Sequence, residues 1–529
     1  MKELLELIVE CRRDMNRHSV FSLLVTLLFC QIVFAERQVS QFGITWTFDR
    51  DYTVGQFANG DYWALGPVTV VDITKSSNMS QRDGSMINPV PSVYHGYDGR
   101  VGGYNQNLDV SMLLPNLVVE PNESLISTIS RIPTEINRAK RRPALEVASV
   151  LTVLDKAPPE GSFRPPYAGS DKPIYSSKQL NSNLLLQLKP VRSTPSLSSV
   201  EDMFEHVWID HVLEWQGDDL HPKQNLINYG AGIAIHSGTG ALRLLLNESI
   251  ERKELLLIRY VQLGIDNFGL VKNGANWGNV GGTIGVGRKI PIIFAGLMLD
   301  NSEMKHVAST YDTRFVFQED GQTFYLTQAE RDATYHPVNC GGDPLICHPG
   351  YYDSTPLGTP EWGDRHYKWL TNDSYNYLPG KPAYLRTTHK STIGAALTVH
   401  LLGLRELWNY DPFLDWTDRC RSEGITGSWG SVFADAMWDA YRADYGPVWS
   451  MYPVLNVIAT GGSVIKTPDK AAYDLGNKVI LRAVADDGYT FAGWSGALQG
   501  MDNPVTIIMH TNKTVTANFA ICEDTQTHN

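Results

Sequence analysis

The chain has 529 residues, too many for a single hydrophobic core, so we expect two to four domains. Hydrophobic residues make up 43% of it and aromatic residues 10%, which indicates a globular protein. The formal net charge of −12 excludes a global basic field that would attract nucleic acid, so no nucleic-acid partner is expected. An acidic polymer would have to bind in a local basic cleft.

An apolar run that ends at Ala35 lies near the N-terminus. The run is short for a membrane span, and Val33 and Ala35 suit the −3 and −1 positions of a cleavage site. We therefore expect residues 1–35 to form a secretory signal peptide that begins at Met1 or Met15, with an uncleaved anchor as the alternative. This predicts a secreted, periplasmic or cell-surface protein without membrane contact after cleavage.

Four of the six cysteines lie beyond this segment. Cys340 and Cys347 flank a turn-like Gly-Gly-Asp-Pro-Leu-Ile stretch, and export permits a disulfide between them. His336 and His348 are close in sequence, so a zinc site is the alternative, although there is no second close pair of cysteines. No motif requires a cofactor, and a structural Ca²⁺ in the β-rich region is left open.

Residues 36–160 contain short runs of alternating apolar and polar residues that are rich in β-branched and aromatic side chains. Gly, Asn, Asp and Pro separate the runs, as expected for strands joined by turns. We predict a β-sandwich-like domain, with strands at Ile44–Phe48, Tyr62–Leu65, Val68–Ile73 and Ala148–Leu154. Residues 161–180 are rich in Pro, Gly and Ser and are interpreted as a linker, in which Arg164 and Tyr167 are candidates for lining a cleft.

From residue 181 to residue 450 the apolar positions follow helical periodicity, with short connections typical of antiparallel hairpins. The predicted helices are Ser198–Trp215, Leu226–Leu246, Lys253–Val271, Lys289–Leu299, His389–Leu404 and Ser431–Tyr445. On the second of them, Tyr229 and His236 are seven residues apart and share one face, beside Asn228. We consider His236 a catalytic candidate, with a structural histidine as the alternative.

A glycine-rich turn, Asn276–Lys289, separates two of these helices. Glycine permits close approach of the backbone to a ligand, and a helix start offers free N–H groups to an anion. We interpret the turn as the floor of a site for an acidic substrate, with Asn276, Trp277, Arg288 and Lys289 as binding residues. A packed turn between two helices is the alternative.

The segment from Arg331 to Arg386 is long, polar and aromatic, and loops of this length in a compact domain are usually functional. Its stretch Pro360–Trp369 holds two acids, two cations, a His and a Tyr. A loop packed by ion pairs is the alternative interpretation. The candidate site residues that this segment supplies are Tyr335, Trp362, Arg365, His366, Tyr367 and Arg386.

The last part of the chain has short strand-like runs that form a separate module, among them Val479–Ala483, Gly488–Gly496 and Asn512–Phe519. Over residues 454–520 this pattern strongly resembles the bacterial internalin-type B repeat, a small all-β module of exported proteins. The resemblance implies a spacer or surface adhesin without catalysis of its own, and a bacterial, exported origin.

A β-rich region followed by helical hairpins, with a glycine-rich turn before Arg288 and Lys289, resembles the α/α-toroid polysaccharide lyases that act on alginate and related polyuronates. The resemblance is architectural, and it implies a multidomain α+β chain whose catalytic α/α-toroid spans residues 181–450. In that superfamily an Asn, His or Arg neutralises the uronate carboxylate, and a Tyr or His serves as base and acid. The turn departs from the family by carrying Thr283 where a catalytic His is expected.

The function that this resemblance implies is a secreted lyase that cleaves an acidic, uronate-containing polysaccharide, such as alginate, glucuronan or ulvan, by β-elimination. Arg288 or Arg365 would hold the substrate carboxylate. Tyr367 would act as base or acid, and His236 or His366 would be its partner.

Two other classes of function stay open. A glycoside hydrolase on the same scaffold needs two carboxyl groups, for which the candidates are Asp218, Asp219, Glu361 and Asp364. A non-catalytic glycan-binding or adhesion protein is the third class, favoured by the C-terminal repeat. The oligomeric state is not predicted.

Overall fold

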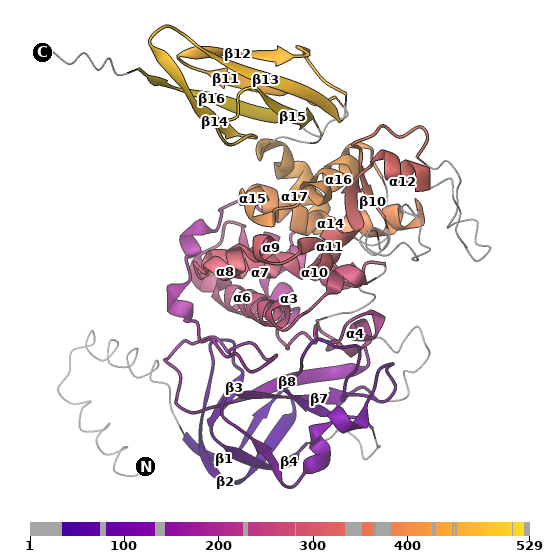
Figure 1. The fold of residues 1–529 in the computed structure, drawn as a ribbon. Coiled ribbons are helices and arrows are strands. Elements are labelled where there is room, and N and C mark those ends of the chain that lie inside the picture. Colours follow the sequence, from indigo (N-terminus) through magenta and orange to yellow (C-terminus); the bar gives the residue numbers. More distant parts are fainter. Residues whose placement is uncertain are drawn as a thin grey trace, which may run out of the picture.

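The computed structural model describes residues 34–74, 81–132, 143–225, 231–280, 282–333, 352–363, 366, 382–425, 430–446, 449, 452–474, 476–509 and 512–522, with the backbone alone for residues 34, 279, 333 and 382–388. Figure 1 shows three successive bodies: a sheet near the N-terminus, a helical region, and a small β module near the C-terminus. Within the described ranges, no helix combines the length and the hydropathy needed to cross a bilayer.

Eight strands of the N-terminal body form one sheet. The strands are β1 (Phe34–Gln41), β2 (Ile44–Gln56), β3 (Tyr62–Leu65), β4 (Val68–Ile73), β5 (Ser85–Ile87), β6 (Leu117–Val119), β7 (Glu123–Ser130) and β8 (Leu145–Leu154). They follow the order β5-β7-β8-β3-β2-β4-β6, with β1 paired to β2. The pair β3–β8 is parallel, and the other pairs are antiparallel.

The β-rich prediction is confirmed, and the four predicted strands coincide with β3, β4 and parts of β2 and β8. The β-sandwich-like arrangement is wrong, because the strands form a single, nearly closed sheet instead of two facing sheets. The reason lies in β2, whose 13 residues pair with β1, β3 and β4 in turn. Register shifts interrupt two of these pairings, and such irregularities bend a sheet and increase its twist.

Strand β8 joins the sheet to the helical region because both of its faces are buried. Leu151 and Val153 belong to the core inside the sheet, whereas Ala148 and Val150 belong to the core of the helical region. Since successive side chains of a strand point to opposite faces, one strand contributes to two cores.

Residues 161–180, interpreted from the sequence as a linker, pack closely against the helical region. Phe163, Arg164 and Tyr167 are buried. A side chain added at Gly269 in the following helical region would lie 2.3 Å from Pro166. This segment therefore runs over the helices in contact with them. Its aromatic and proline side chains pack against the helical region, unlike those of a flexible linker.

The central helix of the second body is α5 (Ala231–Leu244), because it contacts α3, α6, α7, α14 and α17. Twelve of its 14 residues are buried, so the helix is enclosed on every face. The helices of this region are α3 (Leu197–Asp202), α4 (Trp215–Leu220), α5, α6 (Ile250–Lys272), α7 (Lys289–Met298), α8 (Ser302–Lys305), α9 (Val307–Thr310), α10 (Thr313–Val316), α11 (Gln318–Gln322), α12 (Gln328–Ala333), α14 (Pro382–Leu401), α15 (Arg405–Trp408), α16 (Asp411–Ser422) and α17 (Val432–Tyr441).

The helical character predicted for this region is confirmed, and α6 and α7 match their predicted bounds closely. The predicted helix Ser198–Trp215 is wrong in extent, because α3 ends at Asp202 and an irregular stretch follows. The side-chain amide of Asn225 donates to the backbone carbonyls of His206 and Val207, at 2.9 and 3.2 Å, and so satisfies groups that helix bonds would otherwise occupy. The α/α-toroid is not confirmed by the contacts of the described helices.

The C-terminal module consists of two three-stranded sheets, ordered β11-β16-β14 and β12-β13-β15. Its strands are β11 (Leu455–Ala459), β12 (Gly462–Thr467), β13 (Asn477–Ala485), β14 (Tyr489–Gly496), β15 (Val505–Met509) and β16 (Lys513–Ile521). The two sheets enclose a separate core that includes Tyr473, Leu481 and Trp494. The prediction of a small all-β module is confirmed.

Candidate functional site

A buried histidine lies between two tyrosines where loops of the sheet meet the helical region. His211 Nδ1 is 3.3 Å from the hydroxyl oxygen of Tyr167, and His211 Nε2 is 3.3 Å from that of Tyr97. Burial lowers the pKa of His211 to about 3 and raises the pKa of both tyrosines well above their usual value. All three groups are therefore neutral at pH 7. The single N–H of His211 donates to one hydroxyl, and its other nitrogen accepts from the second.

The neighbouring residue, Asp210, contacts a second set of polar groups. Its Oδ1 lies 2.8 Å from Arg288 Nη2 and 3.2 Å from His221 Nε2. The indole N–H of Trp277 donates to the backbone carbonyl of Asp210 at 3.1 Å. Burial by itself would raise the pKa of Asp210, but the nearby Arg288 and His221 lower it to about 2. Asp210 is thus an anion enclosed by cationic and hydrogen-bonding groups.

We name these six residues the junction network: Tyr97, Tyr167, Asp210, His211, His221 and Arg288. Tyr97 comes from the sheet domain, Tyr167 from the segment packed over α6, and Arg288 from the glycine-rich turn before α7. Asp210 and His211 lie in the irregular stretch before α4, and His221 directly follows α4. The network thus ties the sheet to the helices through polar groups that are all buried.

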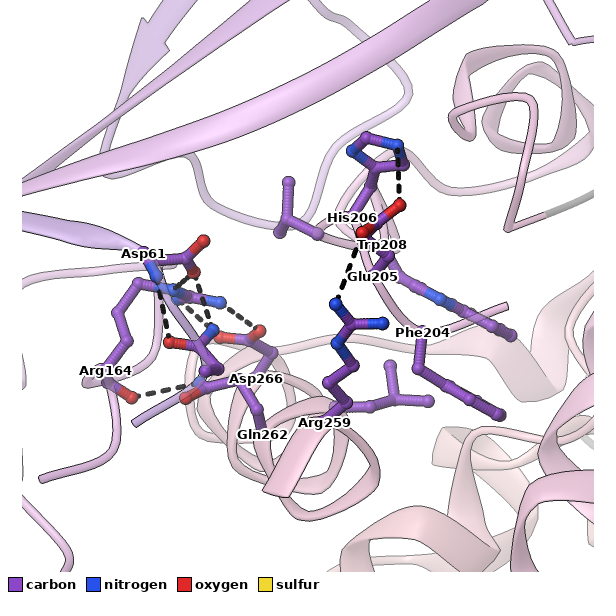
Figure 2. A pocket seen from close by; sticks show the side chains of 12 residues that line it. Asp61, Arg164, Phe204, Glu205, His206, Trp208, Arg259, Gln262 and Asp266 are labelled. Carbon is purple, nitrogen blue, oxygen red and sulfur yellow. Dashed lines mark hydrogen bonds and ion pairs between the residues drawn. The ribbon is translucent and has the colours of Figure 1, made fainter. Parts of the chain in front are cut away.

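Figure 2 shows a narrow cleft lined by residues that include Asp61, Arg164, Glu205, His206, Trp208, Arg259 and Asp266. Arg164 pairs with Asp61 of the sheet domain at 2.5 Å and with Asp266 of α6 at 2.6 Å. Asp266 also accepts the backbone N–H of Tyr167 at 3.2 Å, which connects the cleft to the network. The enclosed space is about 20 Å³, room for about one water molecule, so the cleft does not admit a sugar ring.

The described residues of the glycine-rich turn are packed against other parts of the protein. A Cβ at Gly278 would lie 2.1 Å from the carbonyl oxygen of Arg314, and one at Gly287 would lie 2.6 Å from the Cα of Ala234 in α5. The side-chain amide of Gln318 bonds one N–H and one carbonyl of the turn, both at 2.5 Å. These glycines allow close packing of backbone on backbone, so their contacts favour the packed turn over the floor of a ligand site.

The two cations of the turn are likewise engaged within the protein. Arg288 binds Asp210 and two backbone carbonyls of the turn itself. Lys289 pairs with Asp320, donates to the carbonyl of Trp408 at 2.6 Å, and lies 4.2 Å from the ring centroid of that tryptophan. Both side chains are buried, so these contacts hold the fold together instead of facing an open cleft.

His236 lies on buried α5 close to the junction network. Its Nδ1 is 2.5 Å from the carbonyl oxygen of Asn225, and its ring meets that of Trp208 edge to face at 6.5 Å. Burial lowers its pKa below the usual range, so the ring is neutral at pH 7. The structure thus brings His236, Trp277 and Arg288 into one neighbourhood, with the partly buried Asn276 beside Trp277. Asn228 and Tyr229 lie outside the described residues.

A second neighbourhood surrounds the short ribbon of β9 (Thr323–Tyr325) and β10 (Pro360–Trp362). His366 Nε2 lies 3.1 Å from Glu330 Oε1, and its ring stacks on Phe324 at 3.9 Å. Trp362 packs on Trp416 of α16 at 4.9 Å. Of the other predicted site residues, Tyr335, Arg365, Tyr367 and the side chain of Arg386 lie outside the part of the chain that is described.

The predicted disulfide or zinc site also falls outside that part, with Cys340, Cys347, His336 and His348. Among the residues that are described, no group of three or more His, Cys, Asp or Glu side chains has a metal-binding arrangement. Cys420 is buried with a free thiol, and Cys522 is exposed with a free thiol. The described cysteines thus contribute neither a disulfide nor a metal centre.

Sequence reasoning missed four members of the network: Tyr97, Asp210, His211 and His221. Tyr97 and His211 are 114 residues apart, and Tyr167 is 44 residues from His211. No local spacing can connect three such positions. The one available signal is the stretch His206–His211, where polar residues interrupt an apolar run without helical periodicity.

Comparison with known proteins concerns the C-terminal module alone. No curated protein matches the chain, and no solved structure does. No match covers the helical region, so its resemblance to polysaccharide lyases stays a prediction. Residues 453–522 match the model of a family described as the divergent InlB B-repeat domain, in agreement with the strands β11 to β16 and with the resemblance drawn from the sequence.

Proposed function

We propose that the protein is a secreted bacterial polysaccharide lyase that cleaves a uronate-containing polysaccharide, such as alginate, glucuronan or ulvan, by β-elimination. The observation that carries the proposal is the hydrogen-bonded arrangement of Tyr97, His211 and Tyr167 at the junction of the sheet and the helical region. These side chains are buried, so the proposal requires the two bodies to move apart for a sugar to reach them. Tyrosine and histidine are the acid and base of the lyases that the chain resembles. The similarity of the C-terminal module to a bacterial repeat supports an extracellular or cell-surface location.

β-Elimination breaks the C5–H bond and the C4–O bond of the sugar and forms a C4=C5 double bond. A base must accept the C5 proton, and an acid must protonate the leaving oxygen. The ring of His211 is neutral at pH 7 and has one unprotonated nitrogen that can accept a proton. Its pKa of about 3 makes it a weak base, which passes an accepted proton on readily. The tyrosines keep their protons at pH 7, so a hydroxyl can donate to the leaving oxygen and regain a proton from His211.

The uronate carboxylate needs a cation or a hydrogen-bond donor that makes the C5 proton more acidic. Among the residues assigned to this task from the sequence, Arg288 has its donors occupied by Asp210 and by carbonyls of the turn. The other candidate for the carboxylate is Arg365, which is adjacent in sequence to His366, and Tyr367 follows. These three residues would form a site around His366 that is an alternative to the site around His211. In the site around His211, Arg288 orients Asp210 and the adjacent His211.

The test is ultraviolet absorbance of residues 36–529 incubated with alginate, glucuronan, ulvan, pectate and neutral glucans. A rise on an acidic polymer reports the unsaturated sugar. His211→Ala should lower the rate by about 100-fold or more, the usual contribution of a general acid or base. The control is Tyr94→Phe, because Tyr94 is an exposed tyrosine in the loop that carries Tyr97 and should leave the rate unchanged. Full activity of His211→Ala would contradict the assignment of His211.

The alternatives give different results in the same assay. New reducing ends without absorbance would indicate the hydrolase, which is less favoured because its candidate Glu361 is already paired with Arg419 at 2.5 Å. A non-catalytic adhesion protein is favoured specifically by the match to the B-repeat domain. Binding of a polymer without absorbance and without reducing ends would support it.

A further inference from the structure

A cavity of about 530 Å³ lies between the helical region and the C-terminal module. One wall comes from α15 and the start of α16, over residues 405–411. The other comes from two segments of the module, residues 496–497 and 512–514. Figure 1 shows the module beside this end of the helical region, so each body supplies half of the cavity.

Polar residues predominate among those that line the cavity. Eight of its ten residues have hydrogen-bonding side chains, and the other two are Gly496 and Ala497. Its volume falls within the range of about 300–1,000 Å³ that is common for small-molecule sites, but such sites are usually walled by apolar side chains. In the described part of the chain, no Leu, Ile, Val, Met, Phe or Trp side chain lines the cavity, and a polyhydroxylated ligand finds hydrogen-bonding groups from both bodies.

Lys513 is the cation of this cavity that has not been neutralised. Among the described residues, its ammonium group has no hydrogen-bond or ion-pair partner, although the side chain is half buried. The two acids whose charges act on it are engaged by Arg405, which contacts Asp411 at 2.7 Å and Asp415 at 2.9 Å. Burial lowers the pKa of Lys513, against the opposing effect of these two acids. Partial burial removes some of the water around the ammonium group, and no described protein group replaces it. An anionic ligand would compensate for that loss, so the group favours an anion.

Glu406 also lines the cavity, but it is exposed to water and is therefore a weak competitor for Lys513. The site thus combines four neutral hydrogen-bonding side chains with one half-buried, unpaired cation. A sugar that carries a carboxylate has the complementary combination.

We propose that the cavity between the helical region and the C-terminal module binds a short acidic saccharide, with Lys513 paired to a carboxylate of the sugar. The inference deepens the proposed function, on which it rests for the class of sugar. It gives the module a role beyond that of a spacer: the module completes a saccharide subsite that neither body forms alone. The bound sugar also bridges the two bodies and stabilises their docked arrangement.

The experiment is calorimetric titration of residues 36–529 with tetrasaccharides of mannuronate, guluronate and galacturonate, and with cellotetraose as the neutral probe. Lys513→Met keeps the aliphatic stem and removes the charge. We expect it to weaken binding of the acidic tetrasaccharide by tenfold or more. The matched control is Lys478→Met, since Lys478 is exposed on β13 of the same module and does not line the cavity. Thermal unfolding of both variants verifies that the module is folded.

Equal affinity of Lys513→Met and the unaltered chain would overturn the proposal, as would binding of cellotetraose alone or of no probe. Ultraviolet absorbance of the same samples tests the proposed lyase activity independently of saccharide binding to the cavity. Loss of affinity in Lys513→Met with a flat absorbance trace supports the subsite and rejects the lyase. Rising absorbance with unchanged affinity in Lys513→Met supports the lyase and rejects the subsite.

Discussion

The burial of His211 makes the stability of the protein depend on pH. Its pKa is about 3 in the folded chain and about 6.5 when exposed, so the unfolded chain binds one more proton between these values. The free energy of unfolding therefore falls as the pH falls through this window, by about 1.4 kcal/mol per pH unit for this residue. His211→Gln removes this contribution, so urea unfolding between pH 4 and 6.5 should depend less on pH than in the unaltered chain.

The control for this measurement is His306→Gln, because His306 is exposed at the end of α8 and should leave the pH dependence as it is. The same pH dependence in His211→Gln and in the unaltered chain would show that the folded chain protonates His211 readily. That result would also remove the neutral imidazole on which the proposed chemistry depends.

Single residues also show what the sequence could not supply. The type of residue expected at the site, a Tyr with a His, does occur at the junction, but at Tyr97, Tyr167 and His211. The basic pair Arg288 and Lys289 looked available for a substrate, because sequence spacing does not reveal the buried acids that neutralise it. Asp210 and Asp320 come from segments 78 and 31 residues away.

At the scale of elements, Arg164 fastens the segment of residues 161–180 to both the sheet and α6. Its replacement by Met leaves Asp61 and Asp266 without their cationic partner, and Asp266 is buried. Breaking a buried pair in this way costs about 3–5 kcal/mol. Urea unfolding should register that loss. Lys178→Met in the same segment breaks only an exposed pair with Glu160 and should change stability by about 1 kcal/mol or less.

The crossing of α5 and α14 depends on two glycines that face each other. A Cβ at Gly238 would lie 2.7 Å from the Cα of Gly394. Gly238→Ala therefore separates the helices and should destabilise the protein by about 1–3 kcal/mol, although alanine favours an isolated helix by about 1 kcal/mol. Thermal unfolding shows whether Gly238→Ala lowers or raises the stability of the protein. Glu254→Ala on the exposed face of α6 is the control, and a rise in stability for Gly238→Ala would contradict the close crossing.

Elements with a clear period were predictable, and irregular ones were not. The strands β3 and β4 and the helices α6 and α7 follow periods of two and 3.6 residues, so their bounds could be read from the sequence. The stretch after α3 carries enough apolar residues to suggest a helix, but Trp208, Ile209 and Val212 are buried in an irregular backbone. The amide of Asn225 satisfies carbonyls there, and that long-range bond has no local signature.

At the scale of the whole molecule, the three bodies are joined in different ways. The sheet and the helical region share β8, whose Leu151 lies in one core and whose Val150 lies in the other. The C-terminal module has a core of its own that includes Leu481, and it meets the helices across a polar cavity. Since cooperative unfolding follows shared cores, the first two bodies should unfold as one unit and the module as another.

Calorimetry of the whole chain should therefore resolve two unfolding transitions. Leu481→Ala should lower only the transition of the module, whereas Leu151→Ala should lower only that of the larger unit, each by about 2–5 kcal/mol of stability. Both leucines are fully buried, so the two substitutions remove equal groups from equivalent environments. A single transition that both variants shift would mean that the polar contact between the bodies couples them as strongly as a shared core. An acidic saccharide that binds between the bodies should move the two separate transitions closer together, because ligand bound to both must be released before either unfolds.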